Sequence, residues 1–533
     1  MAPAIASLVA ALLLLDVSLT FDNVWPTPAI KWTGAVSVEL AVCVLAMTIA
    51  ARLGRKPSRL IVAVLSAIWI VLALGRYAEV TAPALYGRDV NLYWDLRFIP
   101  DVAAMVTRVA HLWQILLALT VVAAVFWLLY WLLRTAWRRV ARAMDSRVER
   151  RVLEIAAAVL IALFVARQFT EHIEPQFAAP VTGAYARQVR FAITALTASA
   201  YVPPSPSMTG DLSRIAGADV FVVFVEAYGA VTYTRPELAQ ALTHTRADFE
   251  SAVRDTHRQV VSAFVESPTF GGNSWLAHIT LLSGIEVKDP ERNARLMTEK
   301  RETLPRAFRR RGFRTVALMP GLRIGWPEGA FYGFDDIYGA DRLAYHGPEF
   351  GWFAIPDEYS LERLDAFEVN KPSRAPLFVF FPTISTHFPF SPVPPYQPDW
   401  SKMTDPHPYD GPSIVRAYGR ELDWVNFGPA YADAIAYDLR TIAGYLRLRS
   451  DRDVVMIVLG DHQPAAAVSG AGATWNVPVH IIASRGDVLD AFRTEGFANG
   501  MTPTKNVGKM DALTPMMLSA FSAPATTRSL RTQ

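Results

Sequence analysis

The chain has 533 residues, of which 52% are hydrophobic and only 19% are charged. This composition is too apolar for an ordinary soluble protein of two or three domains, and it predicts a membrane part. The formal net charge of +3 is small for the length and gives no case for nucleic-acid binding. The one cysteine, Cys43, lies in an apolar run, so the composition excludes an intrachain disulfide and a cysteine-based metal site.

Five apolar runs fill the first third of the chain, at residues 4–20, 34–51, 60–75, 112–133 and 152–169. Each is near the length that a bilayer-spanning helix needs. The first run has no basic region before it and is followed by four more, so it is interpreted as an anchor and not as a signal peptide. Residues 1–170 are therefore predicted to form a five-span transmembrane domain.

The loops between these runs differ in charge. Basic residues crowd the second and fourth loops: Arg52, Arg55, Lys56 and Arg59, and then Arg134, Arg138, Arg139, Arg142, Arg147, Arg150 and Arg151. Basic loops stay on the cytoplasmic side of a membrane. The pattern predicts a multi-pass protein of the bacterial-type inner (cytoplasmic) membrane, with everything after about residue 170 outside the cytoplasm, on the periplasmic side.

Two acidic residues, Asp16 and Glu39, fall within the predicted spans. Charges at such places are costly and often functional. A structural polar contact between helices and a contact with substrate both fit these positions.

Residues 171–218 are predicted to form a juxtamembrane helix and a linker. The stretch 184–200 has helical periodicity, and Pro203-Pro-Ser-Pro-Ser207 then breaks the chain. The helix suits the membrane interface, and a plain connecting helix fits equally well.

Residues 219–533 contain apolar, β-rich runs at 220–225, 315–318, 377–382, 454–459 and 477–483, with helical stretches that include 235–265, 432–448 and 487–492. Buried strands that alternate with helices predict an α/β domain with a largely parallel central sheet. Asp433 and Asp438, on the helix predicted at 432–448, are interpreted as charges on its exposed face.

Metal-ligating side chains follow three of the predicted strands. Glu226 follows the first, Ser385-Thr-His387 follows the strand at 377–382, and Gly460-Asp461-His462 follows the strand at 454–459. Ligands of such sheets gather beyond the carboxyl ends of the strands. Each residue alone fits a solvated loop, a turn or a packed histidine, but together these residue types suit Mn, Mg or Zn.

The stretch Ser267–Gly284 carries a candidate nucleophile, Ser274, after two glycines and an asparagine and before an apolar helix. A serine there is a common helix cap, yet a helix N-terminus also attracts phosphate or sulfate. A metal beside it would lower the pKa of the hydroxyl and activate it. His278, one turn later, either orients the site or packs in the core, and the core is favoured.

Together Glu226 after its strand, Ser274, the stretch Thr386-His387-Phe388-Pro389-Phe390 and Gly460-Asp461-His462 resemble the sulfatase-like branch of the alkaline phosphatase superfamily. Five spans before such a domain are similar to the lipoteichoic acid synthase and phosphoglycerol transferase group. The resemblance implies one divalent metal, typically manganese, with zinc or magnesium as alternatives. It would be held by the residues Glu226, Ser274, Asp461 and His462.

The resemblance also implies roles in substrate binding. His387 would face the phosphate or leaving group, and Trp326 lies in the stretch Met319–Glu328 that corresponds to the substrate pocket. The chain departs from the group in having Ser274 where the synthases usually carry Thr, and in lacking a His beside Trp326. The stretch Ser274-Trp-Leu-Ala-His278 also lacks the Cys/Ser-x-Pro-x-Arg motif of sulfatases, which argues against sulfate ester hydrolysis. Phosphoethanolamine transferases usually carry disulfides, which this chain cannot form.

The leading hypothesis is a membrane-anchored, metal-dependent phosphotransferase. Ser274 would take a phosphoglycerol or phosphoethanolamine head group from a phospholipid donor, and an extracytoplasmic glycan or lipid would accept it. A hydrolase that resolves the same intermediate with water is the runner-up, as a phosphodiesterase, a phosphatase or a sulfatase-type enzyme. A non-catalytic binding module is the third hypothesis, and the four intact site positions argue against it.

Overall fold

The computed structural model describes residues 2–24, 27–86, 89–100, 103, 107, 112–169, 176–197, 201–323 and 325–523. The chain divides into two compact units, Met1–Thr197 and Ala198–Gln533. Parts of the predicted linker, residues 171–175 and 198–200, lie outside the described residues, as do the last ten residues of the predicted outer domain.

The first unit is helical, with a short antiparallel pair of strands. Its elements are α1 (Ala2–Thr20), β1 (Phe21–Asn23), β2 (Ile30–Trp32), α2 (Val38–Arg52), α3 (Arg59–Tyr86), α4 (Leu92–Asp95), η1 (Leu96–Phe98), α6 (Leu112–Ala143), α7 (Arg147–Arg167) and α8 (Val181–Thr197). The helix α1 packs on α6, α3 on both α6 and α8, and α2 on α7.

Three helices among the described residues are long and apolar enough to cross a membrane, over Pro3–Thr20, Arg59–Leu85 and Leu112–Ala143. They agree with the first, third and fourth predicted spans. The helix α2 has 15 residues and is about 22 Å long, short of a hydrocarbon core of about 30 Å. The helix α7 begins with the charged residues of the fourth loop. The count of five spans therefore stays a prediction.

Asp16 and Glu39 meet at one residue of this unit. The amide of Ser37 donates to Oδ1 of Asp16 at 2.8 Å, and the Ser37 hydroxyl donates to Oε2 of Glu39 at 3.0 Å. Oε1 of Glu39 accepts from the amide of Thr182, which lies in α8, at 3.3 Å. These contacts tie α1, α2 and α8 together, as expected for the structural alternative.

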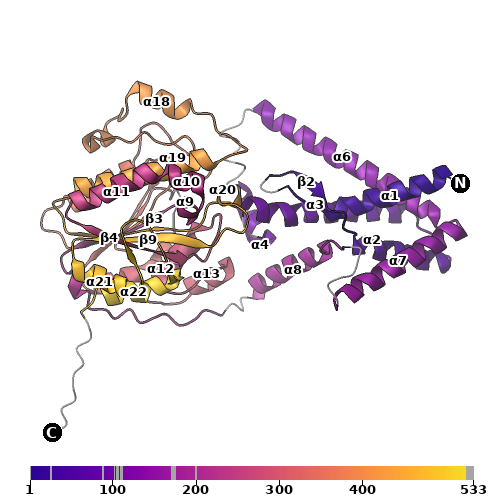
Figure 1. Ribbon diagram of the computed structural model, residues 1–533, viewed down its shortest axis with the longest axis horizontal. Helices are drawn as coiled ribbons and strands as arrows, with labels where there is room; N and C mark the ends of the chain where they lie inside the picture. The colour runs from indigo at the N-terminus through magenta and orange to yellow at the C-terminus, as the bar shows by residue number, and fades with distance from the viewer. Residues whose placement is uncertain are drawn as a thin grey trace, which may run out of the picture. The chain divides into compact units, whose positions relative to one another are not determined.

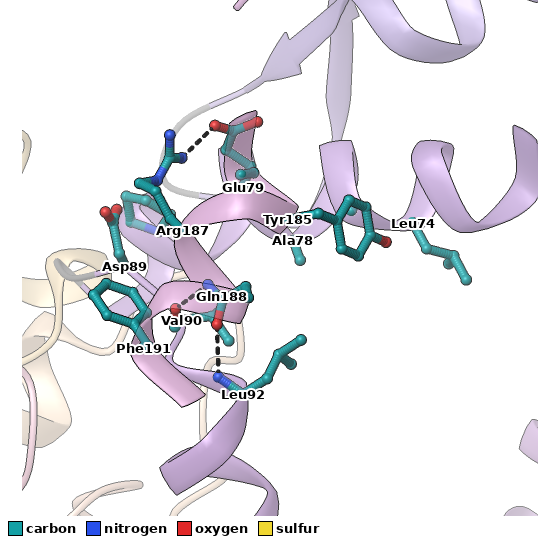
Figure 2. A pocket seen from close by; sticks show the side chains of 13 residues that line it. Leu74, Ala78, Glu79, Asp89, Val90, Leu92, Tyr185, Arg187, Gln188 and Phe191 are labelled. Carbon is teal, nitrogen blue, oxygen red and sulfur yellow. Dashed lines mark hydrogen bonds and ion pairs between the residues drawn. The ribbon is translucent and has the colours of Figure 1, made fainter. Parts of the chain in front are cut away.

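A cavity of about 240 Å³ lies in this unit, lined by residues of α3, α4 and α8 (Figure 2). An ion pair of 2.7 Å joins Arg187 to Glu79, and Gln188 holds the main chain of Val90 and Leu92. The helices α3 and α8 pack closely at Gly75, where an added Cβ would lie 2.5 Å from the ring of Tyr185.

The second unit is built on a sheet of nine strands: β3 (Asp219–Val225), β4 (Gln259–Glu266), β5 (Arg314–Met319), β6 (Asp336–Gly339), β7 (Leu377–Pro382), β8 (Val454–Gly460), β9 (Asn476–Ala483), β10 (Ala498–Asn499) and β11 (Asn506–Lys509). The order is β10-β4-β9-β8-β3-β7-β5-β6, with β11 beside β4. From β8 to β6 the strands are parallel, and β9 runs antiparallel to both neighbours. The predicted α/β fold with a largely parallel sheet is confirmed.

Helices cover both faces of this sheet (Figure 1). They are α9 (Val231–Thr234), α10 (Pro236–Ala241), α11 (Thr243–Asp255), α12 (Ser274–Ser283), α13 (Pro290–Met297), α14 (Leu304–Arg310), α15 (Gly329–Tyr332), α16 (Ala340–Leu343), α17 (Asp357–Leu364), α18 (Gly411–Tyr418), α19 (Gly428–Leu448), α20 (Ala466–Ser469), α21 (Gly486–Thr494) and α22 (Leu513–Ala520). The short turns are η2 (Ser213–Ile215), η3 (Asp365–Val369), η4 (Trp400–Thr404) and η5 (Met510–Ala512).

The sequence of the central strand β3 is apolar throughout because the strand lies between two helical layers. Phe221, Val223 and Val225 face the cluster formed with α10, α11 and α19. Val220 and Phe224 face the cluster formed with α12, α14 and α22. Both faces of a strand between two helical layers are buried, so the alternation of polar and apolar residues disappears.

The predicted helix over 235–265 is wrong in its last third. The helix α11 ends at Asp255, and His257 takes a positive φ of 57° that turns the chain. The residues 259–266 then form β4, which pairs along its whole length with β9. This run is rich in valine and carries Phe264, and such residues pack better in a sheet than in a helix.

Candidate active site

The register of the sheet brings the predicted strand exits together. Val225 of β3 pairs with Gly460 of β8, so Glu226 and Asp461 leave neighbouring strands at the same level. Phe224 pairs with Pro382 of β7 on the other side, where residues 383–387 leave the sheet. A Cβ at Gly460 would lie 1.9 Å from the carbonyl oxygen of Tyr228, so only glycine permits this approach.

Ser274 reaches the site from a separate turn. Gly271, Gly272 and Asn273 all have positive φ, at 66°, 139° and 61°, and α12 begins at Ser274. The amide of Gly271 donates to the carbonyl oxygen of Gln463 at 3.0 Å, which fastens this turn to the segment after β8. Glycine and asparagine adopt these left-handed conformations most easily, and this explains the residues before the serine.

The Ser274 hydroxyl makes contacts that a simple cap would not. Its Oγ donates to Oε2 of Glu226 at 2.8 Å and lies 3.2 Å from Nε2 of His462. Two other hydroxyls of the stretch Ser267–Gly284 have partners outside the site. Thr269 bonds the carbonyl oxygen of Gly272 within its turn, and Ser283 bonds that of Ile279 within α12.

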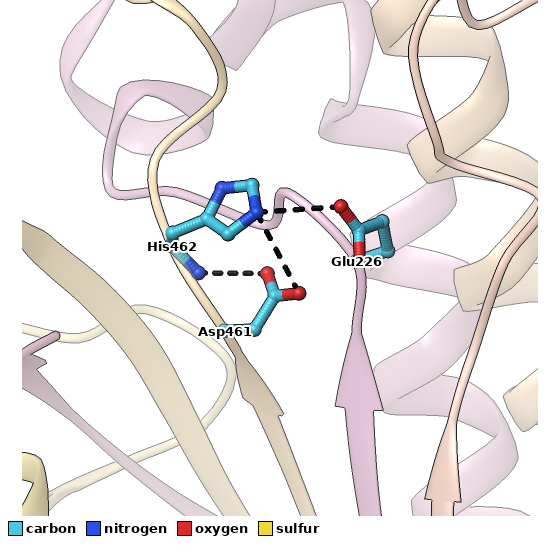
Figure 3. Close-up of side chains that lie close together, drawn as sticks. All are labelled: Glu226, Asp461 and His462. Atoms are coloured by element: carbon cyan, nitrogen blue, oxygen red, sulfur yellow. Dashed lines mark hydrogen bonds and ion pairs between the residues drawn. The ribbon is translucent and has the colours of Figure 1, made fainter. Parts of the chain in front are cut away.

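Glu226, Asp461 and His462 form a tight cluster (Figure 3), the one group of three or more ligating side chains found among the described residues. Nε2 of His462 lies 3.3 Å from Oε1 of Glu226 and 3.8 Å from Oδ2 of Asp461. Nδ1 of His462 lies 2.7 Å from the carbonyl oxygen of Gln463, an acceptor, so Nδ1 carries the proton. Nε2 faces the carboxylates. It can donate a proton to them or, where a bound cation displaces that proton, would turn its lone pair to the cation.

In this cluster burial and charge shift the pKa of Asp461 in the same direction, but those of Glu226 and His462 in opposite directions. Burial raises the pKa of Asp461 far above its usual range, and the charge of Glu226 raises it further. Burial also acts to raise the pKa of Glu226, but the hydrogen bond and charge of His462 outweigh it and the pKa falls. The pKa of His462 is raised to about 9 because the charges of Asp461 and Glu226 outweigh burial. The site therefore attracts positive charge.

The donor set fits a divalent cation. Oδ1 of Asp461 accepts from the amides of Ala227 and His462, both at 2.7 Å. Oδ2 of Asp461 is buried and has no hydrogen-bond partner among the described residues, although it faces Nε2 of His462. A carboxylate oxygen so placed needs a further partner, and oxygen and imidazole ligands together suit Mn²⁺ or Zn²⁺. Glu226, Asp461 and His462, with Ser274 as fourth ligand, would hold it.

His387 lies beside this cluster, close enough for its charge to lower the pKa of Glu226. Its Nδ1 lies 2.7 Å from the carbonyl oxygen of Phe388, which leaves Nε2 for another partner. The ring of Phe353 packs against His387 with 5.0 Å between centroids, and the Arg323 guanidinium lies over the same phenyl ring. Arg323 therefore approaches the surroundings of His387, which the sequence did not predict.

Trp326 lies elsewhere. Its ring packs on Tyr332 with 5.2 Å between centroids, at the edge of the core cluster that contains α12 and α14. The contacts described for Trp326 do not join it to the cluster of Glu226, Asp461 and His462, so its role in substrate binding stays a prediction.

The predictions for His278 and Asp438 have different outcomes. His278 packs against Phe224 and Phe380, as the core interpretation expected, and burial lowers its pKa to about 4. The interpretation of Asp438 as an exposed helix charge is wrong. It is 1% exposed, and its Oδ2 accepts from the Thr383 hydroxyl at 2.6 Å. The sequence of a helix does not show whether a given carboxylate faces the core or the solvent.

A family model described as Sulfatase matches residues 192–481, more than half of the chain. No curated protein matches the chain. A solved protein of the alkaline phosphatase superfamily from Vibrio parahaemolyticus is 15% identical over 60% of this chain and 69% of its own, with a TM-score of 0.38.

Two other similar structures are named as transferase or synthase. The phosphoglycerol transferase GacH of Streptococcus pyogenes, in complex with sn-glycerol-1-phosphate, is 12% identical over 63% of this chain and 80% of its own, with a TM-score of 0.38. The lipoteichoic acid synthase LtaP of Listeria monocytogenes is 12% identical over 54% and 70%, with a TM-score of 0.34.

Proposed function

The chain belongs to the sulfatase family, and from this premise we propose that it is a membrane-anchored, metal-dependent phosphotransferase. It moves a phosphoglycerol or phosphoethanolamine head group from a phospholipid to an extracytoplasmic glycan or lipid. The observation that carries the proposal is the position of the Ser274 Oγ, within hydrogen-bond distance of both Glu226 and His462. A hydroxyl held between candidate ligands of a divalent cation is suited to act as a nucleophile.

The first step is attack of the Ser274 Oγ on the phosphorus of the donor. The Oγ–P bond forms, and the bond from phosphorus to the diacylglycerol oxygen breaks. The Ser274 proton is lost to solvent before the attack, because Glu226, whose pKa is lowered, is too weak a base to keep it. A bound divalent cation would lower the pKa of the serine hydroxyl and draw the phosphate oxygens toward it. The first amides of α12, which begins at Ser274, favour the anionic group as well.

His387 acts on the leaving group. With Nδ1 beside the carbonyl oxygen of Phe388, its Nε2 gives a proton to the departing diacylglycerol oxygen. In the second step an acceptor hydroxyl gives its proton back to Nε2 and attacks phosphorus. The new O–P bond forms, and the bond from phosphorus to the Ser274 Oγ breaks, which restores the ionised serine. Water in place of the acceptor gives hydrolysis, the runner-up function.

The remaining parts of the proposal concern the surroundings of the site. The cation is manganese, with zinc or magnesium as alternatives. The chain crosses a bacterial-type inner membrane with five spans in residues 1–170, and residues 219–533 form the catalytic domain in the periplasm after a linker at 171–218. Three membrane-length helices support the anchor. Trp326 contacts the head group or the acceptor.

The test is a reaction of the detergent-solubilised chain with head-group-labelled phosphatidylglycerol or phosphatidylethanolamine. Diacylglycerol with a modified acceptor identifies transfer, and release of the free head-group phosphate identifies hydrolysis. We expect Ser274→Ala to abolish both and to leave the fold intact, because the N-cap of α12 is Asn273 and not Ser274. Mass spectrometry of wild-type protein trapped with donor should find a head-group phosphate on the peptide that contains Ser274.

The matched control is Ser283→Ala, which removes a hydroxyl from the other end of the same helix. It should leave turnover intact, because the hydrogen bonds described for Ser283 lie within and just after α12. An active Ser274→Ala protein, or an adduct that persists in it, would refute the assignment of the nucleophile.

A further inference from the structure

The main chain of Glu226 is held at both of its polar atoms by the loop that follows β7. Its amide donates to Oγ1 of Thr383 at 3.2 Å, and its carbonyl oxygen accepts from the hydroxyl of Thr386 at 2.6 Å. The direction of the Glu226 side chain therefore depends on this loop. The loop continues into His387, whose amide donates to the carbonyl oxygen of Ile384.

Two aspartates from separate helices fasten every residue of this loop. Oδ2 of Asp438, on α19, accepts from Thr383 at 2.6 Å and lies 3.4 Å from Oγ1 of Thr386. Asp357, at the start of α17, accepts from the amide of Ile384 at 3.0 and 3.1 Å and from that of Ser385 at 2.7 Å. Residues 383–386 are thus held by hydrogen bonds to the two carboxyl groups.

The two carboxyl groups are within hydrogen-bonding distance of each other and are 0% and 1% exposed for Asp357 and Asp438. Within the described parts of the chain, no cationic side chain forms an ion pair with either of them, and their partners are hydroxyls and amides. Oδ1 of Asp438 is buried and has no partner in the same residues. Two buried negative charges side by side would be very costly, so one group keeps its proton.

The hydrogen bonds show which group keeps it. Asp357 uses both oxygens to accept from main-chain amides, an arrangement that suits a carboxylate better than an acid, whose hydroxyl oxygen is the weaker acceptor. Asp438 has the free Oδ1, which a proton would turn into a donor toward Asp357. The electrostatics agree: burial and then the charge of Asp357 raise the pKa of Asp438 far above its usual range, whereas burial raises that of Asp357 only to about 6. The nearby Tyr437 stays neutral because burial raises its pKa.

We propose that Asp357 and Asp438 are positioning residues that share one proton, carried on Oδ1 of Asp438, and that through Thr383 and Thr386 they fix the main chain of Glu226. The pair orients a ligand of the cation from behind, and it holds the loop that carries His387. This inference rests on the proposed function only in taking Glu226 as a cation ligand.

We expect the substitution of aspartate by asparagine to have different effects at the two positions. Asp438→Asn keeps an oxygen for Thr383 and places an N–H where the proton sits, so the variant should behave as the wild type. Asp357→Asn places an N–H₂ against the amides of Ile384 and Ser385, so it should release the loop. Each variant replaces a buried carboxyl group by an amide of the same shape, so a general effect of that replacement would appear in both, and each variant is the control for the other.

Two measurements on the full chain in detergent compare the Asp357→Asn and Asp438→Asn variants with the wild type. The first is hydrogen exchange in the peptide that covers residues 383–390, which should rise in Asp357→Asn and stay unchanged in Asp438→Asn. The second is the affinity for Mn²⁺, which should fall about 10- to 100-fold in Asp357→Asn, as for other groups that orient metal ligands. Equal behaviour of the two variants in exchange would overturn the proposal.

Thr383 supplies a second test should Asp357→Asn fail to fold. Thr383→Val removes only the hydroxyl between Asp438 and the amide of Glu226, and it should weaken Mn²⁺ binding. Thr383→Ser should restore it. Wild-type affinity in Thr383→Val would show that the pair does not act through Glu226, and would overturn the inference.

Asp461→Ala separates this inference from the proposed function. Normal Mn²⁺ binding in Asp461→Ala would refute the metal site itself. The exchange of the amides of Ile384 and Ser385 would then still decide whether Asp357 and Asp438 position the loop.

Discussion

Glu358, next to Asp357 on α17, is a carboxyl group that the fold keeps neutral. Its side chain is 0% exposed, and Oε2 accepts from the amide of Gln397 at 3.1 Å. Oε1 has no partner among the described residues. Burial raises the pKa of Glu358 to about 8, with a further rise from the charge of Glu362. At neutral pH the folded protein therefore holds it mainly as a protonated acid.

The cost of that burial depends on pH. The pKa of Glu358 is about 8 in the folded chain against an ordinary 4.5. Because the folded pKa is the higher one, the contribution to stability is fully present below pH 4.5 and is lost as the pH rises through about 8. At about 1.4 kcal/mol for each pH unit, the loss amounts to about 5 kcal/mol.

The variant Glu358→Gln cannot ionise, so it escapes this loss. We expect it to match the wild type within about 1 kcal/mol near pH 5, and to be more stable by up to about 5 kcal/mol above about pH 9. Pulse proteolysis of the full chain in urea measures this, with survival of peptides from residues 201–523 as the signal. Glu421→Gln, at an exposed glutamate, is the matched control and should show no such change with pH. A difference between Glu358→Gln and wild type that is the same at both pH values would refute the reasoning.

Three further changes test other parts of the molecule. Asp461→Ala should lose the divalent cation, which elemental analysis of the purified protein measures, and full occupancy would show that the ligand assignment is wrong. A reporter fused after residue 533 should be active only outside the cytoplasm, because the basic loops are predicted to lie inside, and a cytoplasmic signal would exclude five spans. Arg374→Met should destabilise the second unit by about 3–5 kcal/mol, since it leaves buried Asp219 without its cation. Urea unfolding measures this change, and a loss below about 1 kcal/mol would show that the pair is not a desolvated one.

The sequence predicted the central strands well because each is buried on both faces. A run such as residues 454–459 is apolar throughout, and only a strand between two helical layers requires that in so few residues. The strand β4 was mistaken for the end of a helix because no glycine or proline marks the boundary between them. It follows α11 directly after a turn at His257.

The support behind the site could not be predicted in the same way. Asp357 and Asp438 sit on helices among residues of mixed polarity, and helical periodicity does not distinguish a buried carboxyl from a solvated one. Their burial depends on a shared proton and on the amides and hydroxyls of the loop after β7. Those partners lie far away in sequence, and only the fold brings them close.

Strand order explains which of the predicted site residues meet. Glu226, His387 and Asp461 follow β3, β7 and β8, which are neighbours in the sheet. Trp326 follows β5, which lies beyond β7. Neighbouring strands are about 4.8 Å apart, so the exit of β5 is about 10 Å from that of β3 and about 15 Å from that of β8. In the proposed function Trp326, which packs on Tyr332 and not on the proposed cation ligands, would therefore contact the head group or the acceptor and not the phosphate. Substitutions in the β5 exit should therefore change which donor or acceptor is used, whereas substitutions at the exits of β3 and β8 should remove the reaction altogether.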